Sequence, residues 1–145
     1  MALSDASCVI VSARKLSHKF PVSKFQNKKI LVCGATGFIG RNLVERLAAR
    51  GDCEVIAVEH NRPRYAIDGV EWLSADLTRA EDVDRVVAGA DIIVQAAATT
   101  SGSKDIVTQP FIHTTDNAVM NSLLLRAAYT HGVGHFFFFS CTIMY

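Results

Sequence analysis

The sequence has 145 residues, about the length of one domain, and half of them are apolar, which is enough for a packed core. Residues 1–29 hold six basic residues and one acid, whereas the remainder holds nine basic and thirteen acidic residues. This acidic body argues against a nucleic-acid partner, which would need clustered lysine and arginine. No apolar run approaches the roughly 18–20 residues that a membrane span needs, so no membrane partner is expected.

The first 28 residues are rich in serine and lysine and lack a hydrophobic period. We expect residues 1–28 to be a disordered or targeting-like extension; their composition fits an organelle transit peptide better than a secretory signal. An upstream start codon would also explain them. The sequence has four cysteines and no C-x-x-C pair, which suits buried thiols in a reducing compartment. A cytoplasmic location is therefore predicted, with organelle targeting left open.

From residue 29 the chain alternates short apolar runs with segments of helical period. KILVC (29–33) is typical of a buried strand. The segment 38–51 carries apolar residues at helical spacing, Ile39 among them, and Gly51 is placed to end this helix. EVIAVE (54–59) predicts the second strand.

The next elements form a second strand–helix unit. VEWLSAD (70–76) predicts a third strand. Thr78 and Glu81 match the T-x-x-E capping box, so a helix is predicted to begin there and to end near Gly89.

A third unit follows, with a long connection inside it. DIIVQAAA (91–98) predicts a fourth strand running into a loop over 99–115 that is rich in serine and threonine. A loop of this length within a compact domain is often functional. Thr115 or Asp116 is predicted to cap a long helix that continues through His131.

HFFFFS (135–140) predicts a fifth strand, interpreted as a core strand rather than a platform for stacking bases. Strands that alternate with helices imply right-handed crossovers and a parallel sheet covered on both faces. Residues 29–145 are therefore predicted to be an α/β domain with a Rossmann-type doubly wound sheet of about five strands. His131 and His135 lie four apart, but Gly132 interrupts the helix between them, so no metal site is expected.

The string GATGFIG follows the first predicted strand and opens the first helix. Its spacing is G-x-x-G-x-x-G, formed by Gly34, Gly37 and Gly40. Gly34 would allow a tight turn, Gly37 would let a pyrophosphate approach the backbone, and Gly40 would let the helix pack close to the strand. The free N–H groups and partial positive charge of a helix N-terminus suit the phosphates of a dinucleotide.

Glu59 ends the second predicted strand, nineteen residues after Gly40. A carboxylate there can accept hydrogen bonds from both ribose hydroxyls of an adenosine and would repel a 2′-phosphate, so it favours NAD. Arg62 and Arg64 follow closely and can attract that phosphate, so NADP remains possible. The alternative is that Glu59 is a solvated strand end and the glycines only a turn.

The glycine spacing resembles that of the short-chain dehydrogenase/reductase superfamily. SADL around Asp76, IIVQAAA, TTDNAVMNSLLLRAAYTHGV and the final SCTIMY are similar to its extended branch, the NAD-dependent epimerase/dehydratase family, with a likeness to GDP-L-fucose synthases. The resemblance covers roughly residues 29–145. It implies a site for NAD(P) built from the phosphate loop, an acid for the ribose, a pair beside the adenine and a wall beside the nicotinamide ribose. These positions are Thr36, Gly37, Phe38 and Ile39; Glu59; Asp76 and Leu77; Ala96, Ala97 and Ala98.

Asn117 matches an asparagine that, in this superfamily, helps to tie a helix to the loop after the fourth strand; otherwise it is a residue of the first helical turn. The family places a serine or threonine four residues before the last tyrosine of the SSxxxY-like segment, where its hydroxyl bonds the reacting sugar oxygen. That position is Cys141 here, and a thiol is a weaker donor. Either Thr142 takes this role, or the polarising group is weak; Cys141 can also be a buried structural thiol.

The Y-x-x-x-K motif, which supplies the family's acid–base pair, does not occur in the sequence. Gly69 stands four residues after Tyr65, Val133 four after Tyr129, and Tyr145 is the last residue. The resemblance thus implies the NAD(P)-binding portion of an enzyme that moves a hydride through nicotinamide, acting on a nucleotide sugar only if the missing C-terminal part is supplied. We expect the 145-residue chain alone to be inactive.

Other functions remain open. The chain can be a non-catalytic dinucleotide-binding protein, a partner subunit or a truncated gene product. The fifth strand, internal in the intact fold, would be an edge here. We therefore expect self-association, or a partner that covers this strand.

Overall fold

The computed structural model describes residues 24–99, 108 and 111–140. Its five strands form one parallel sheet in the order β3-β2-β1-β4-β5. They are β1 (Lys29–Cys33), β2 (Glu54–Glu59), β3 (Val70–Ser74), β4 (Ile92–Gln95) and β5 (His135–Phe138). The predicted α/β class with a doubly wound, Rossmann-type sheet is confirmed.

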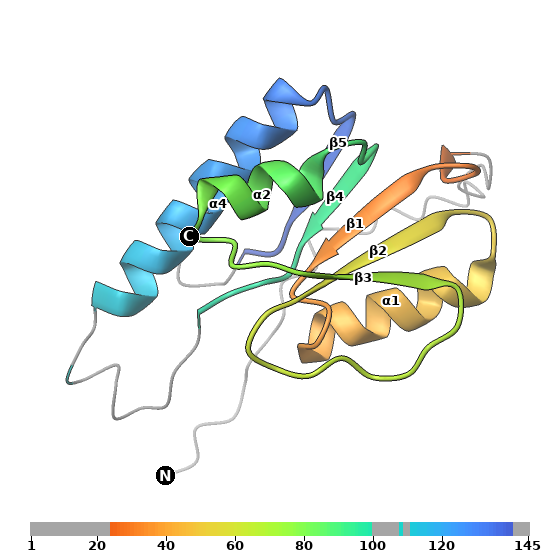
Figure 1. Ribbon diagram of the computed structural model, residues 1–145, viewed down its shortest axis with the longest axis horizontal. Helices are drawn as coiled ribbons and strands as arrows, with labels where there is room; N and C mark the ends of the chain where they lie inside the picture. The colour runs from red at the N-terminus through yellow and green to blue at the C-terminus, as the bar shows by residue number, and fades with distance from the viewer. Residues whose placement is uncertain (1–23, 100–107, 109–110, 141–145) are drawn as a thin grey trace, which may run out of the picture.

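Helices cover both faces of the sheet (Figure 1). The helix α1 (Phe38–Arg50) lies on one face, and α2 (Ala80–Val87) and α4 (Phe111–Thr130) lie together on the other. Alternate residues of each central strand therefore point into two different apolar clusters, as the period of a strand requires. In β1, Leu31 faces α2 and α4, whereas Ile30 and Val32 face α1. Because both faces are buried, the central strands read as continuous apolar runs.

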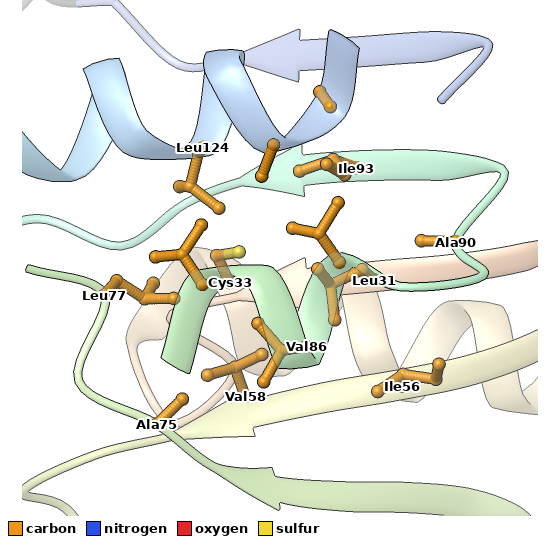
Figure 2. Close-up of a cluster of buried hydrophobic side chains, with 14 of the residues drawn as sticks. Leu31, Cys33, Ile56, Val58, Ala75, Leu77, Val86, Ala90, Ile93 and Leu124 are labelled. Carbon is orange, nitrogen blue, oxygen red and sulfur yellow. The ribbon is translucent and has the colours of Figure 1, made fainter. Parts of the chain in front are cut away.

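The larger cluster joins the sheet to α2 and α4 (Figure 2). Leu31 of β1, Ile93 of β4 and Leu124 of α4 are fully buried in it, and Val86 of α2 is 1% exposed. Truncating a side chain so placed to alanine typically costs about 2–5 kcal/mol. This buried cluster therefore holds α2 and α4 on the sheet.

The helix α1 follows its predicted bounds, but its apolar residues at helical spacing are not equally buried. Gly51 ends the helix in the left-handed conformation, with φ 67°. Val44 is fully buried, whereas Ile39 is 45% exposed. Ile39 belongs to the first turn of the helix, and helical spacing alone does not show which of the apolar residues are buried.

The predicted capping box at Thr78 is wrong. The helix α2 begins at Ala80, with Arg79 at the N-cap and no side chain bonded as a cap. The Thr78 hydroxyl instead donates to Asp76 Oδ1 at 2.6 Å. A threonine in this position can bond a neighbouring side chain as readily as a helix end, and here the local turn takes it.

The predicted start of the long helix is also wrong. Helix α4 begins at Phe111, so Thr115 and Asp116 are helical residues and not caps. The Thr115 hydroxyl donates to the Phe111 carbonyl at 2.9 Å, the backward bond that threonine makes within helices. Residues 111–115, which the sequence predicts to be part of a loop, are therefore helical.

The fifth strand is present, but most of its aromatic side chains are not in the core. Phe136 is partly buried against the cluster below α4, whereas Phe137, Phe138 and Phe139 are 48%, 52% and 45% exposed. Among the described residues β5 pairs with β4 and forms an edge of the sheet. The interpretation of this run as a core strand therefore holds for its secondary structure and for one side chain. In the part of the chain that the structure describes, no helix is both long and apolar enough to cross a membrane.

Candidate dinucleotide site

The candidate site lies at the carboxyl edge of the sheet, between β1 and β4. The chain leaves β1 toward β2 on one side, while β4 lies on the other, so the strand order reverses at this point. Ligands of open α/β sheets bind outside the strand ends at such a reversal. The glycine turn after β1, Glu59 at the end of β2 and Ala96–Ala98 after β4 all belong to this edge.

Gly34 makes the first turn of the site and lies against the loop after β4. Its φ is 73°, in the left-handed region, and a Cβ on it would lie 2.6 Å from both Cα and N of Ala97. The neighbouring Ala35 N–H donates to Val58 O at 3.2 Å, and Ala96 N–H donates to Cys33 O at 3.1 Å. The turn is thus fixed to β2 on one side and to β4 on the other.

Gly40 brings α1 down onto this turn. A Cβ on Gly40 would meet the carbonyl oxygen of Gly34 and would lie 2.7 Å from Gly34 C and 2.9 Å from Ala35 Cα. The close approach predicted at this position is therefore present, and its partner is the turn that follows the strand. Two of the three glycines leave no room for any side chain.

The N-terminus of α1 is open to an anion. Gly37 is its N-cap; no side chain caps it, and its first turn contains no acid. Phe38 is 87% exposed and Ile39 45%, so the apolar side chains of this turn extend outward. Unpaired N–H groups and the helix dipole favour a negative charge here, and no carboxylate of the helix competes for them. Thr36 is half-buried within the same turn.

Glu59 is half-buried at the end of β2 and already has one partner. Its Oε2 accepts a hydrogen bond from the backbone N–H of Arg64 at 3.0 Å. The carboxylate thereby closes the loop 60–64, on which Arg62 and Arg64 are exposed. The structure thus places one acid and two basic side chains at the end of β2.

Asp76 organises the turn after β3. Hydrogen bonds from the hydroxyl and then the backbone N–H of Thr78 lower the pKa of Asp76 below its usual value. The Asp76 N–H in turn donates to Asp82 Oδ2 at 2.9 Å. The next residue, Leu77, is 6% exposed, and its side chain belongs to the core.

Ala96, Ala97 and Ala98 follow β4 and form the side of the site opposite Glu59. Asn117 of α4 bonds this loop in both directions: its Oδ1 accepts from Thr99 N–H at 2.9 Å, and its Nδ2 donates to Thr99 O at 3.2 Å. The tie between helix and loop that the resemblance implies is present. Asn117 lies well inside α4, which rules out the alternative of a residue in the first helical turn.

Sequence reasoning missed Gln95 and Asn121, which lie beneath this loop. Gln95 is 2% exposed, and its Nε2 donates to Asn121 Oδ1 at 2.9 Å. The available signal was a single amide at the end of an otherwise apolar strand. Cys141 and Thr142, the predicted polarising positions, lie outside the described residues.

Two surface hollows in the described part of the chain lie away from this edge. One, of about 320 Å³, is between α2 and α4, and the other, of about 470 Å³, includes Asp52 and Gly69. Within the described ranges, no three histidine, cysteine or acidic side chains come together as a metal site requires. His131 bonds Asp84 of α2 at 2.7 Å instead.

Comparison with known proteins shows the family of this chain. Residues 30–145 match the model of the NAD dependent epimerase/dehydratase family. The chain belongs to this family. Its sequence is 34% identical over 121 residues to dTDP-L-rhamnose 4-epimerase of Burkholderia thailandensis, a match that covers 77% of the chain and 33% of that enzyme.

Solved structures agree with the assignment. Uronate dehydrogenase of Agrobacterium tumefaciens is 31% identical with a TM-score of 0.60, covering 72% of this chain and 37% of that one. DesIV, a dTDP-glucose 4,6-dehydratase of Streptomyces venezuelae solved with NAD and TYD bound, is 27% identical with a TM-score of 0.65, covering 74% of this chain and 38% of that one. The chain spans from 8% to 35% of the length of the curated relatives that it matches.

Proposed function

We propose that this chain binds NAD at the carboxyl edge of its sheet. The observation that carries the proposal is the glycine turn: at Gly34 and at Gly40 a Cβ would collide with backbone, so this stretch is built for close approach. The turn delivers an uncapped helix N-terminus to the point where the strand order reverses. The features fit a pyrophosphate, which needs N–H donors and room near the backbone.

The remaining parts of the site would bind the two nucleosides. Glu59 would accept hydrogen bonds from the ribose hydroxyls of the adenosine, with Asp76 and Leu77 beside the adenine. The segment Ala96–Ala98 would form the wall beside the nicotinamide ribose, supported by Asn117. Thr36, Phe38 and Ile39 would line the phosphates, and Arg62 would remain at the rim near the adenosine.

We propose further that the chain is the NAD-binding portion of an enzyme acting on a sugar. The named relatives support this, since they are a dTDP-L-rhamnose 4-epimerase, a dTDP-glucose 4,6-dehydratase and a uronate dehydrogenase. The finer likeness to GDP-L-fucose synthases stays a prediction. Bound NAD would supply hydride exchange, while the residues of this chain bind and orient it. The sequence contains no Y-x-x-x-K, so we expect binding by this chain without turnover.

Calorimetric titration of the full chain with NAD and NADP tests the proposal. The wild type should prefer NAD, because the Glu59 carboxylate repels a 2′-phosphate. Glu59→Gln keeps an oxygen that can accept a hydrogen bond from the Arg64 N–H but removes the charge. The ratio of the affinities for NAD and NADP should therefore fall by about tenfold. Glu71→Gln removes an exposed carboxylate from β3 and serves as the control, with the wild-type preference. No binding of NAD at millimolar concentration would overturn the proposal.

A further inference from the structure

Gln95 joins the candidate site to α4 through a buried amide. It is the last residue of β4 and, at 2% exposure, the one buried polar side chain among the described residues. Its Oε1 accepts from Ala97 N–H at 3.2 Å, and its Nε2 donates to Asn121 Oδ1 at 2.9 Å. Because a buried amide that loses a partner is costly, this arrangement favours one orientation of the side chain.

The backbone bonded by Gln95 is the backbone that rests on Gly34. The last strand-like bond between β1 and β4 is that of Ala96 N–H to Cys33 O. The next amide, that of Ala97, bonds the Gln95 side chain instead. Ala97 is also where a Cβ on Gly34 would come within 2.6 Å. The Gln95 side chain therefore holds Ala97 in this contact, one residue beyond the last strand-like bond.

Helix α4 supports the same loop at two residues about one helical turn apart. Asn117 and Asn121 are four residues apart and so lie on one face of the helix. Asn117 bonds Thr99 directly, and Asn121 holds Gln95, which bonds Ala97. The loop is thus fixed from α4 where β4 has ended.

We infer that Gln95 and Asn121 are positioning residues of the dinucleotide site, which hold Ala97 against the turn at Gly34. For its ligand the inference rests on the proposed function. The wall that they support lies on the β4 side, where the nicotinamide ribose would bind. Removing the support should therefore weaken binding of NAD while leaving binding of ADP, which would need only α1, Glu59 and the turn after β3, almost unaffected.

The variants separate the hydrogen bonds from the packing. Gln95→Met keeps an unbranched side chain and removes the bonds to Ala97 and Asn121, together with the bond that Nε2 donates to Met120 Sδ at 3.2 Å. Asn121→Leu removes only the oxygen acceptor on α4. Asn121→Asp keeps an acceptor oxygen at a half-buried position and should rescue the loss. Ser122→Ala is the matched control, because this exposed neighbour bonds a carbonyl of its own helix.

Two measurements are made on the full chain: calorimetric titration with NAD and with ADP, and amide hydrogen exchange by NMR without ligand. Gln95→Met should speed amide exchange at Ala97 by about tenfold and should lower the affinity for NAD by about tenfold, the scale of one buried hydrogen bond. The affinity for ADP should change by less than about twofold. Asn121→Leu should act in the same direction. Asn121→Asp and Ser122→Ala should match the wild type.

Wild-type exchange at Ala97 in Gln95→Met would overturn the inference, and so would equal losses of NAD and ADP. If the wild type binds neither nucleotide, the proposed function fails, and the positioning role is then tested by amide hydrogen exchange alone. Faster exchange at Ala97 in both Gln95→Met and Asn121→Leu supports this role, and unchanged exchange refutes it. If Gln95→Met does not fold, Asn121→Leu compared with Asn121→Asp carries the same test.

Discussion

Replacing Gly34 with alanine tests the geometry on which the candidate site depends. Two costs combine at this position. The φ of 73° is unfavourable for any residue with a Cβ, which amounts to about 1–2 kcal/mol. The new Cβ would also lie 2.6 Å from Ala97 N and Cα, and such overpacking typically costs about 1–3 kcal/mol because backbone must move.

Two other glycines separate these costs. Gly51 has a φ of 67° and nothing within 4 Å of a new Cβ, so Gly51→Ala carries the strain alone. Gly40 lies in α1 and carries the collision alone. The gain from restricting the unfolded chain is shared by all three variants and cancels in the comparison. Gly34→Ala should therefore be less stable than Gly51→Ala by about 1–3 kcal/mol.

Thermal unfolding followed by circular dichroism measures this difference. For a chain of this size about 1 kcal/mol corresponds to roughly 3–4 °C, so Gly34→Ala should melt about 3–10 °C below Gly51→Ala. Denaturant unfolding of the same variants gives the free energy independently. If Gly34→Ala and Gly51→Ala melt within about 2 °C of each other, the loop after β4 does not rest on Gly34 and the reasoning fails.

Three further predictions concern other parts of the fold. Thr78→Val removes the largest cause of the lowered Asp76 pKa, so NMR titration should find this pKa closer to 3.8. Because the pKa of Asp76 in the folded state lies below that in the unfolded state, the variant should be less stable than wild type near neutral pH, and this difference in stability should vanish as the pH falls through the folded pKa. A difference in stability that does not change with pH contradicts this. Burial raises the pKa of the Cys33 thiol to about 12, so timed alkylation should label Cys53 before Cys33, and equal rates at these two thiols would refute the burial. The exposed edge at β5 should make the chain self-associate, and Phe137→Lys should weaken this; a monodisperse wild-type monomer in size-exclusion chromatography with light scattering counts against it.

The sheet and the glycine turn were predictable because each leaves a strong local signal. Apolar runs that alternate with helical periods predict a parallel sheet, and the spacing of Gly34, Gly37 and Gly40 after a strand predicts the turn. Helix starts were less predictable. Thr78 and Thr115 both fit a capping pattern, but their hydroxyls bond Asp76 and the Phe111 carbonyl. The same hydroxyl can satisfy several neighbours, and only the fold decides among them.

Contacts between distant segments could not be read from the sequence. The pairing of Gln95 with Asn121 joins residues 26 apart, and the contact of Gly34 with Ala97 joins β1 to β4. The sequence indicated that Gly34 would allow a tight turn, which is a local requirement. Gly34 also has no room for a Cβ because its backbone contacts Ala97, and this contact exists only in the assembled sheet.

The glycine turn and the amide side chains that hold the loop after β4 both keep this edge of the sheet in a fixed conformation. A dinucleotide site made from backbone N–H groups works best when those groups already point at the ligand, since ordering a loop on binding reduces affinity. The turn at Gly34 is fixed on the β2 side by the bond from Ala35 to Val58 O. On the other side the last strand-like bond between β1 and β4 is that of Ala96 N–H to Cys33 O, so the ladder does not reach Ala97. The amides of Gln95, Asn117 and Asn121 replace the missing ladder, which makes α4 part of the site although it lies on the opposite face of the sheet from α1.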